Sequence, residues 1–243
     1  MSFIKIGLVG KRYEDIKLYV DTNIIGETNN CRRVDKSLGG IYNFKQTSID
    51  SDNNVVWKFI EKGTKEAFII QDTANSKRTS YTQKTKESQI EANLVRSLNM
   101  LNWVHFCYLD DLGNIESLSE LSIPHSIDFC LNKDRLSYTE YMNNATIVFD
   151  SRERKELYKD IHISTPIVLH DEYGCEVIVN GKKKYEEFCT PLKGLSVNGA
   201  GDLYAKYFIQ KHFIEGADLE ESSTYALRET TEFLKIGNTS EKI

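Results

Sequence analysis

The segment Val197 to Asp202, VNGAGD, places two glycines and a carboxylate where a loop becomes a helix. Apolar residues recur at three- and four-residue steps from Leu203 to Ile214, which predicts a helix that starts near Gly201. Glycines let the backbone turn sharply, and the first N–H groups of a helix have no partner within it, so such an end attracts phosphate. Asp202 is then either a favourable charge against the helix dipole or a general base beside a phosphate site, and this motif alone does not decide between them.

Two earlier segments carry side chains suited to a sugar. Asp15 follows the apolar, strand-like run Ile4 to Val9, and the pair Gly39-Gly40 stands just before Asn43. A carboxylate can accept two hydrogen bonds from the hydroxyls of a vicinal diol, and an amide can both donate and accept, so this set fits a polyol. Each residue alone could equally cap a helix or permit a turn.

In this order the three segments resemble the ribokinase-like (PfkB) family of carbohydrate and nucleoside kinases, and the resemblance extends over almost the full chain. It implies a role for each segment. The implied anion hole and catalytic base are Gly199, Ala200, Gly201 and Asp202. The implied substrate-binding residues are Asp15, Gly39, Gly40, Asn43 and Arg78.

Further roles follow from looser matches to the same family. Arg78 stands in the predicted lid, where it either reaches the active site or is a solvated hairpin charge. Asp150 and Glu153 occupy the place of an Asn-x-x-Glu element that organises magnesium through water. Carboxylates can hold such a cation, although both could instead be charges at a helix N-terminus. The resemblance assigns Asn198 and Gly174 to the nucleotide.

The segment Leu169 to Asp171 departs from the family pattern. Family members usually have Thr-x-Gly here, whereas this chain has Leu-His-Asp before Gly174. A side chain at position 171 removes a close backbone approach, and its negative charge repels a polyphosphate unless a cation intervenes. We therefore expect ATP to bind weakly, and more weakly without magnesium.

Composition excludes several classes of protein. The 243 residues suffice to bury a core as one domain, and 40% hydrophobic with 28% charged residues is ordinary for a globular protein. A net charge of −5 without a basic block argues against a nucleic-acid partner. The sequence has neither a membrane-spanning apolar run nor a signal-peptide pattern. Five widely spaced cysteines indicate reduced thiols in a cytoplasmic protein.

Short apolar runs alternate with helical patterns, which predicts right-handed crossovers in a mostly parallel sheet with ligands at the carboxyl ends of its strands. The predicted strands are 4–9, 67–70, 104–108, 126–130, 146–149 and 166–170. The predicted helices are 54–62, 85–100, 138–142, 151–159, 201–214 and 219–235. Two ribbons interrupt this pattern, 17–25 with 30–36 and 67–73 with 77–83, and the resemblance makes them a β lid.

The resemblance thus implies a three-layer α/β/α ribokinase-like sandwich over residues 1–243, with a mostly parallel sheet and a small β lid inserted at about 16–37 and 66–84. It implies ATP- and Mg²⁺-dependent phosphorylation of a hydroxyl on a sugar or sugar-like metabolite. In some family members the lid also pairs two subunits, so a homodimer through the lid is a further expectation. The rival hypotheses are a catalytically weak or inactive relative that binds a sugar or nucleotide, and a nucleoside kinase.

Overall fold

The computed structural model describes residues 3–46, 54–74, 77–85, 88–131, 133–192 and 198–239. Within these ranges ten strands form one sheet, and the short strands β5 (Ser88–Gln89) and β7 (Leu112–Gly113) pair separately. The order along the sheet is β12 (Lys182–Phe188), β11 (Gly174–Val179), β10 (Ile167–Asp171), β9 (Ile147–Ser151), β8 (His125–Asp128), β6 (Trp103–Phe106), β1 (Ile4–Val20), β3 (Val55–Asp72) and β4 (Lys77–Thr82). Strand β2 (Cys31–Gly40) pairs with β1.

The described α-helices are α1 (Ala92–Leu98), α2 (Thr139–Asn144), α3 (Ala200–Ile209) and α4 (Leu219–Thr239). A π-helical turn, η7 (Gln210–Ile214), continues α3. The 3₁₀ segments are η1 (Ile41–Gln46), η3 (Leu109–Asp111), η4 (Ile115–Glu120), η5 (Leu136–Tyr138) and η6 (Arg152–Tyr158). No helix in this part of the chain is both long and apolar enough to span a membrane.

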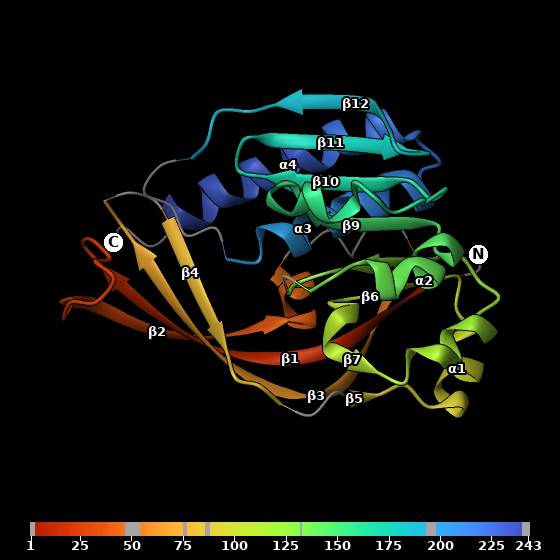
Figure 1. The fold of residues 1–243 in the computed structure, drawn as a ribbon, viewed down its shortest axis with the longest axis horizontal. Coiled ribbons are helices and arrows are strands. Elements are labelled where there is room, and N and C mark those ends of the chain that lie inside the picture. The colour runs from red at the N-terminus through yellow and green to blue at the C-terminus, as the bar shows by residue number, and fades with distance from the viewer. Residues whose placement is uncertain are drawn as a thin grey trace.

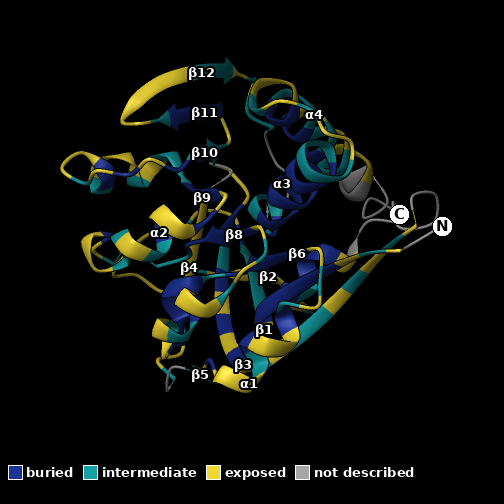
Figure 2. Ribbon diagram, turned by 90° about the vertical axis from the view of Figure 1, so that its right-hand side faces the viewer, coloured by how far each residue is buried: buried dark blue, intermediate teal, exposed yellow. Residues whose placement is uncertain are grey.

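The elements form three layers. Helices α3 and α4 cover one face of the sheet, and α1 and α2 lie on the other (Figures 1 and 2). Neighbouring strands from β3 through β1, β6, β8 and β9 to β10 are parallel, whereas β11 and β12 run antiparallel at the edge. The predicted α/β fold with a mostly parallel sheet is therefore confirmed.

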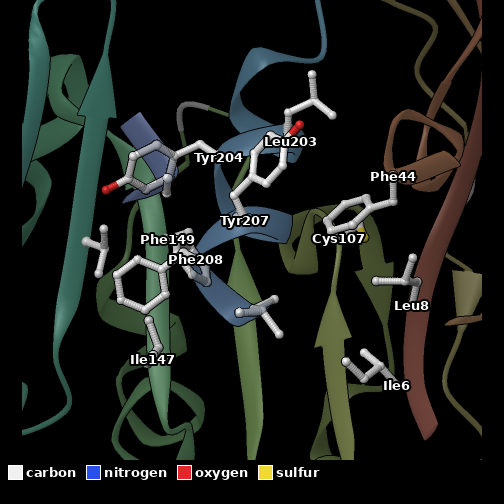
Figure 3. Packing of buried hydrophobic residues seen from close by; sticks show 14 of the residues in the cluster. Ile6, Leu8, Phe44, Cys107, Ile147, Phe149, Leu203, Tyr204, Tyr207 and Phe208 are labelled. Atoms are coloured by element: carbon white, nitrogen blue, oxygen red, sulfur yellow. The ribbon is translucent and has the colours of Figure 1, made fainter. Parts of the chain in front are cut away.

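Alternation along the central strands divides the core into two clusters. Ile6 and Leu8 of β1 and Phe149 of β9 face α3, where the Phe149 ring meets Phe208 edge-on at 5.3 Å (Figure 3). Val9 of β1 lies in the other cluster, among side chains of α1 and α2. Both faces of these strands are buried, as their short apolar runs predict.

The lid is a continuation of the core sheet. Strand β1 pairs with β3 in parallel from Ile4 to Val20, with one register shift after Gly10. The distal half of β1 also pairs with β2, and the distal half of β3 pairs with β4. The two ribbons predicted from sequence are thus present, joined into one four-stranded surface.

The structure corrects one predicted helix. Of residues 54–62, which were predicted as a helix, 55–62 form the first half of β3, beside β1. Burial alternates there with a period of two, since Val55 and Trp57 are partly buried while Val56 and Lys58 are exposed. This run of β-branched and aromatic residues suits a strand with one covered face. The prediction was wrong because an apolar run this short fits either a helix or a strand.

Other predicted boundaries shift. The helix predicted for 85–100 contracts to α1, and 151–159 becomes the 3₁₀ segment η6. Lys182 is the first residue of strand β12, and the turn before it lies at Asn180 and Gly181. Asn43 lies within η1, and residues 47–53 lie outside the described ranges.

A buried ion-pair cluster lies at the carboxyl end of β9. Arg135, which is fully buried, donates to Asp150 at 3.0 Å and lies 3.5 Å from Asp110. Arg154 donates to the other oxygen of Asp150 at 2.5 Å, and the Tyr158 hydroxyl donates to Oδ2 at 2.6 Å. Each charge in this cluster depends on its partners, because an unpaired buried charge is strongly unfavourable.

We expect Arg135→Met to lower the free energy of unfolding by about 3–5 kcal/mol, because it leaves two buried carboxylates without their shared cation. Urea denaturation followed by circular dichroism measures this change. The matched control is Arg228→Met, which removes an exposed pair with Glu229 and should cost less than about 1 kcal/mol. Equal effects of the two variants would contradict the structural role of the cluster.

Candidate active site

Asp202 lies in the first turn of α3, with only 3% of its surface exposed. The residue that caps this helix, Gly199, has φ of +79°, and a Cβ there would lie 2.8 Å from the side-chain Cγ of Asn43. Glycine is therefore needed at 199 both for the left-handed turn and for the close approach of Asn43. The first N–H groups of α3, which have no acceptor within the helix, belong to the same turn as Asp202.

The two oxygens of the Asp202 carboxylate have different surroundings. Oδ2 accepts a hydrogen bond from Nδ2 of Asn43 at 2.7 Å and another from the Tyr108 hydroxyl at 2.8 Å. Oδ1 is buried and has no hydrogen-bond partner among the described residues. Burial raises the pKa of Asp202 to about 6, and the hydrogen bonds from Asn43 and Tyr108 oppose that rise. The carboxylate can therefore exchange a proton near neutral pH.

Asp15 reaches the same site from the lid part of β1. Its Oδ2 accepts from Nδ2 of Asn198 at 2.7 Å, and Arg78 of β4 donates to Oδ1 of Asn198 at 3.0 Å. A side chain at Gly39 would collide with the Asp15 carboxylate, so glycine makes room for it. Burial raises the pKa of Asp15 as well. The lid and the start of α3 are thus joined through Asn198.

The structure brings together most residues assigned from sequence to the acceptor and the catalytic base. Gly40 ends β2 directly before η1, which carries Asn43. The assembled residues are Asp15, Gly39, Asn43, Arg78, Asn198, Gly199 and Asp202. Asn198, which the resemblance assigns to the nucleotide, lies between two lid residues here.

The region assigned to the nucleotide is built from the end of β10. A Cβ at Gly201 would lie 3.0 Å from Cε1 of His170, so the imidazole packs against the first turn of α3. Burial lowers the pKa of His170 to about 4, so the ring is neutral, and its Nε2 has no partner among the described residues. Asp171 accepts from the N–H of Tyr173 at 2.8 Å and lies 3.8 Å from Arg152. Its carboxylate therefore stabilises the β10–β11 turn.

Gly174 follows this turn as the first residue of β11. A side chain at 174 would collide with the backbone oxygen of Glu187 on β12. The close pairing of β11 with β12 thus accounts for this glycine, whether or not it also approaches a nucleotide.

Asp150 and Glu153, predicted to organise magnesium, do not join the site. Both oxygens of Asp150 are taken by arginine and tyrosine donors, and Glu153 is exposed at the start of η6. No group of three or more His, Cys, Asp or Glu side chains in the described ranges is arranged to hold a metal ion. A role for these two residues in holding magnesium through water therefore stays a prediction.

Two residues near Asp202 were missed by the sequence analysis. Tyr108 follows β6 and has φ of +63°, and Asp128 is the last residue of β8. Burial raises the pKa of Asp128 well above its usual value, and the Asp202 charge adds to this. Their position at the carboxyl ends of predicted parallel strands was the one signal that could have indicated them.

The sequence and the structure were compared with those of known proteins. No protein-family model matches the sequence, and no curated protein sequence does. Solved structures match over nearly the whole chain. Arabidopsis thaliana ribokinase, complexed with ribose and ATP, is 12% identical with a TM-score of 0.63, covering 95% of this chain and 92% of that one. The protein has the ribokinase-like fold.

Other matches share this fold but differ in what they act on. A nucleoside kinase from Methanocaldococcus jannaschii is 14% identical with a TM-score of 0.62, covering 96% of this chain and 92% of that one. A pyrophosphate-dependent kinase in the ribokinase family is 16% identical with a TM-score of 0.64, covering 95% of each chain. At such identities the likeness establishes the ribokinase-like fold alone.

We expect the buried charge of Asp202 to lower the free energy of unfolding. Above about pH 6 the carboxylate is ionised in both the folded and the unfolded chain, and the raised pKa then lowers stability by about 1–3 kcal/mol. Below about pH 4 both states are protonated and the penalty disappears. Asp202→Asn keeps an oxygen for both donors, so we expect it to stabilise the fold at pH 8 but not at pH 4.

Urea denaturation at the two pH values measures this difference. The control is the same substitution at Asp160, an exposed residue, which should change stability little at either pH. If Asp202→Asn destabilised the protein at pH 8, the charge of Asp202 would not be the unfavourable feature.

Proposed function

We propose that the protein transfers a phosphoryl group from ATP to a hydroxyl of a sugar or sugar-like metabolite. The observation that carries this proposal is the buried Asp202 carboxylate, at the N-terminus of α3, with one oxygen that has no hydrogen-bond partner among the described residues. A general base beside a set of unpaired N–H groups is the arrangement that phosphoryl transfer needs. The nearby Asp15 and Asn43 supply acceptors and a donor for a polyol.

In the proposed mechanism, Asp202 accepts the proton of the attacking hydroxyl. Backbone N–H groups of Gly199, Ala200 and Gly201 stabilise the charge that develops on the transferring phosphoryl group. Asp15 and Asn43 bind the other hydroxyls of the acceptor and hold the attacking one in line. The four-stranded lid covers this region and would exclude water, which otherwise competes as the acceptor.

We expect the protein to bind the phosphoryl donor weakly. Asp171 places a carboxylate where a polyphosphate would approach, and Arg152, its nearest cation, also pairs with Glu186 at 2.9 Å. Among the described residues the chain supplies no built magnesium site, so a role for Mg²⁺ stays a prediction based on the charge of the donor. We infer weak ATP binding, which also favours a second candidate, a non-catalytic sugar-binding relative.

We also propose that the protein is located in the cytoplasm. All five cysteines, Cys31, Cys107, Cys130, Cys175 and Cys189, are free thiols. This supports a reducing compartment such as the cytoplasm.

The function is tested by a thermal-shift screen of sugars, sugar phosphates and nucleosides, followed by transfer assays with ATP and with pyrophosphate, each with and without Mg²⁺. We expect a sugar to bind and to be phosphorylated. Asp202→Asn should then lower turnover about 10²–10⁴-fold with acceptor affinity retained, whereas Asp15→Ala should raise KM. A nucleoside as the best acceptor would favour the nucleoside kinase. Sugar binding without transfer from either donor would favour the non-catalytic relative.

We also propose that the outer face of the lid joins two copies of the chain. In the observed register Leu38 pairs with Glu14, Val34 with Leu18, and Phe68 with both Ile16 and Tyr81, so these side chains share one face. The exposed fractions of Val34, Leu38, Phe68 and Tyr81 are 56, 48, 43 and 57%. A depression of about 350 Å³ opens on this face beside Leu38. An apolar face of this kind on two copies is self-complementary about a two-fold axis.

Phe68→Glu should convert a dimer into a monomer, because it buries a charge at the centre of this face. Sedimentation velocity on the full chain measures the change. Met100→Glu alters an exposed apolar residue after α1, outside this face, and should leave the dimer intact. A monomeric parent protein at tens of micromolar would contradict this proposal.

A further inference from the structure

Tyr108 lies between Asp202, the candidate base, and Tyr13, where β1 enters the lid. Its hydroxyl donates to Oδ2 of Asp202, and its ring packs against Tyr13 with centroids 5.5 Å apart. The Tyr13 hydroxyl donates to Asp111 at 3.0 Å, and Lys65 of β3 pairs with the same carboxylate at 2.9 Å. The Tyr108 ring therefore packs against a tyrosine of β1 whose hydroxyl is bound by Asp111 of η3, which in turn pairs with Lys65 of β3.

The backbone of Tyr108 is in the left-handed region, with φ of 63° and ψ of 64°. Non-glycine residues seldom adopt this conformation, and where they do so near a functional group the surrounding structure must hold them there. Burial and the Asp202 charge both raise the pKa of the Tyr108 phenol well above its usual value. The hydroxyl therefore keeps its proton and remains a donor to Asp202.

We propose that Tyr108 is a positioning residue for the base: together with Asn43 it holds Oδ2 of Asp202, so that Oδ1 is the oxygen that faces the acceptor hydroxyl. This inference rests on the proposed kinase function. In the transfer step the hydroxyl proton moves to Oδ1 while the hydroxyl oxygen forms its bond to phosphorus. The bond from phosphorus to the leaving phosphate oxygen breaks, and its electron pair stays with the leaving group.

The donor from Tyr108 also favours the ionised form of Asp202, because a hydroxyl hydrogen bond is stronger to a carboxylate than to a carboxylic acid. Removing that hydroxyl should therefore raise the pKa of Asp202. The other ionisable groups around Asp202 stay in place when only this hydroxyl is removed. They are Asp15 of β1, Arg78 of β4, Cys107 after β6, Asp128 of β8, Cys130 after β8 and, against Gly201, His170 of β10.

The test is a ¹³C NMR titration of the Asp202 carboxyl carbon in the full chain, assigned with Asp202→Asn. Tyr108→Phe keeps the ring and its contact with Tyr13, and we expect it to raise the pKa of Asp202 by about one unit from the parent value near 6. Tyr13→Phe removes a neighbouring hydroxyl that donates to Asp111, and should leave the Asp202 titration unchanged. Asn43→Ala removes the other donor to Oδ2 and should raise the pKa in the same direction.

This readout needs no turnover, so it separates failure of the inference from failure of the proposed function. An Asp202 titration in Tyr108→Phe equal to that of the parent would overturn the inference even if the protein proves to be a kinase. Once an acceptor is known, turnover of Tyr108→Phe should be about fivefold lower at pH 6 and close to the parent at pH 8.5, since the acid limb moves with the pKa. A loss that is equal at all pH values would assign Tyr108 a structural role instead.

Discussion

The parallel pairing of β1 with β3 is the constraint on which the rest of the structure depends. It runs without interruption by a loop from Ile4 to Val20, so the same two strands form one side of the core sheet, beyond β6, and the root of the lid. Ile6 and Leu8 anchor β1 beneath α3, and Asp15 follows on the same strand. The Asp15 carboxylate and the helix that carries Asp202 are therefore fixed relative to each other by core packing.

Two buried aspartates show how environment separates a structural charge from a reactive one. Asp150 is fully buried, but two arginines and a tyrosine occupy its oxygens. Asp202 is almost as buried, but it has only neutral donors, and one oxygen has no partner in the described ranges. The pKa of Asp202 rises to about 6 because its charge is not compensated to the same degree. Such uncompensated burial is typical of functional sites.

The region proposed to bind the phosphoryl donor differs from the surroundings of Asp202. There the side chains already satisfy one another, since Asp171 caps the β10–β11 turn and Arg152 lies between Asp171 and Glu186. A polyphosphate would have to compete with these contacts, whereas Asp202 on the proposed acceptor side has a carboxylate oxygen with no partner among the described residues. The ribokinase-like fold hosts sugar and nucleoside kinases and a pyrophosphate-dependent kinase among the structures compared, so the fold does not select a donor.

The sequence by itself determined the local features. Apolar runs indicated most core strands, the helical period after Gly201 indicated α3, and the order of three motifs indicated which residues would meet. It misassigned 54–62, because a short apolar run suits a helix or a strand until its neighbour β1 is known. Only the tertiary structure placed Tyr108 against Asp202, 94 residues away, and used Asp150 in an ion-pair cluster. Contacts of this kind depend on strand order and on packing between layers, which no local pattern encodes.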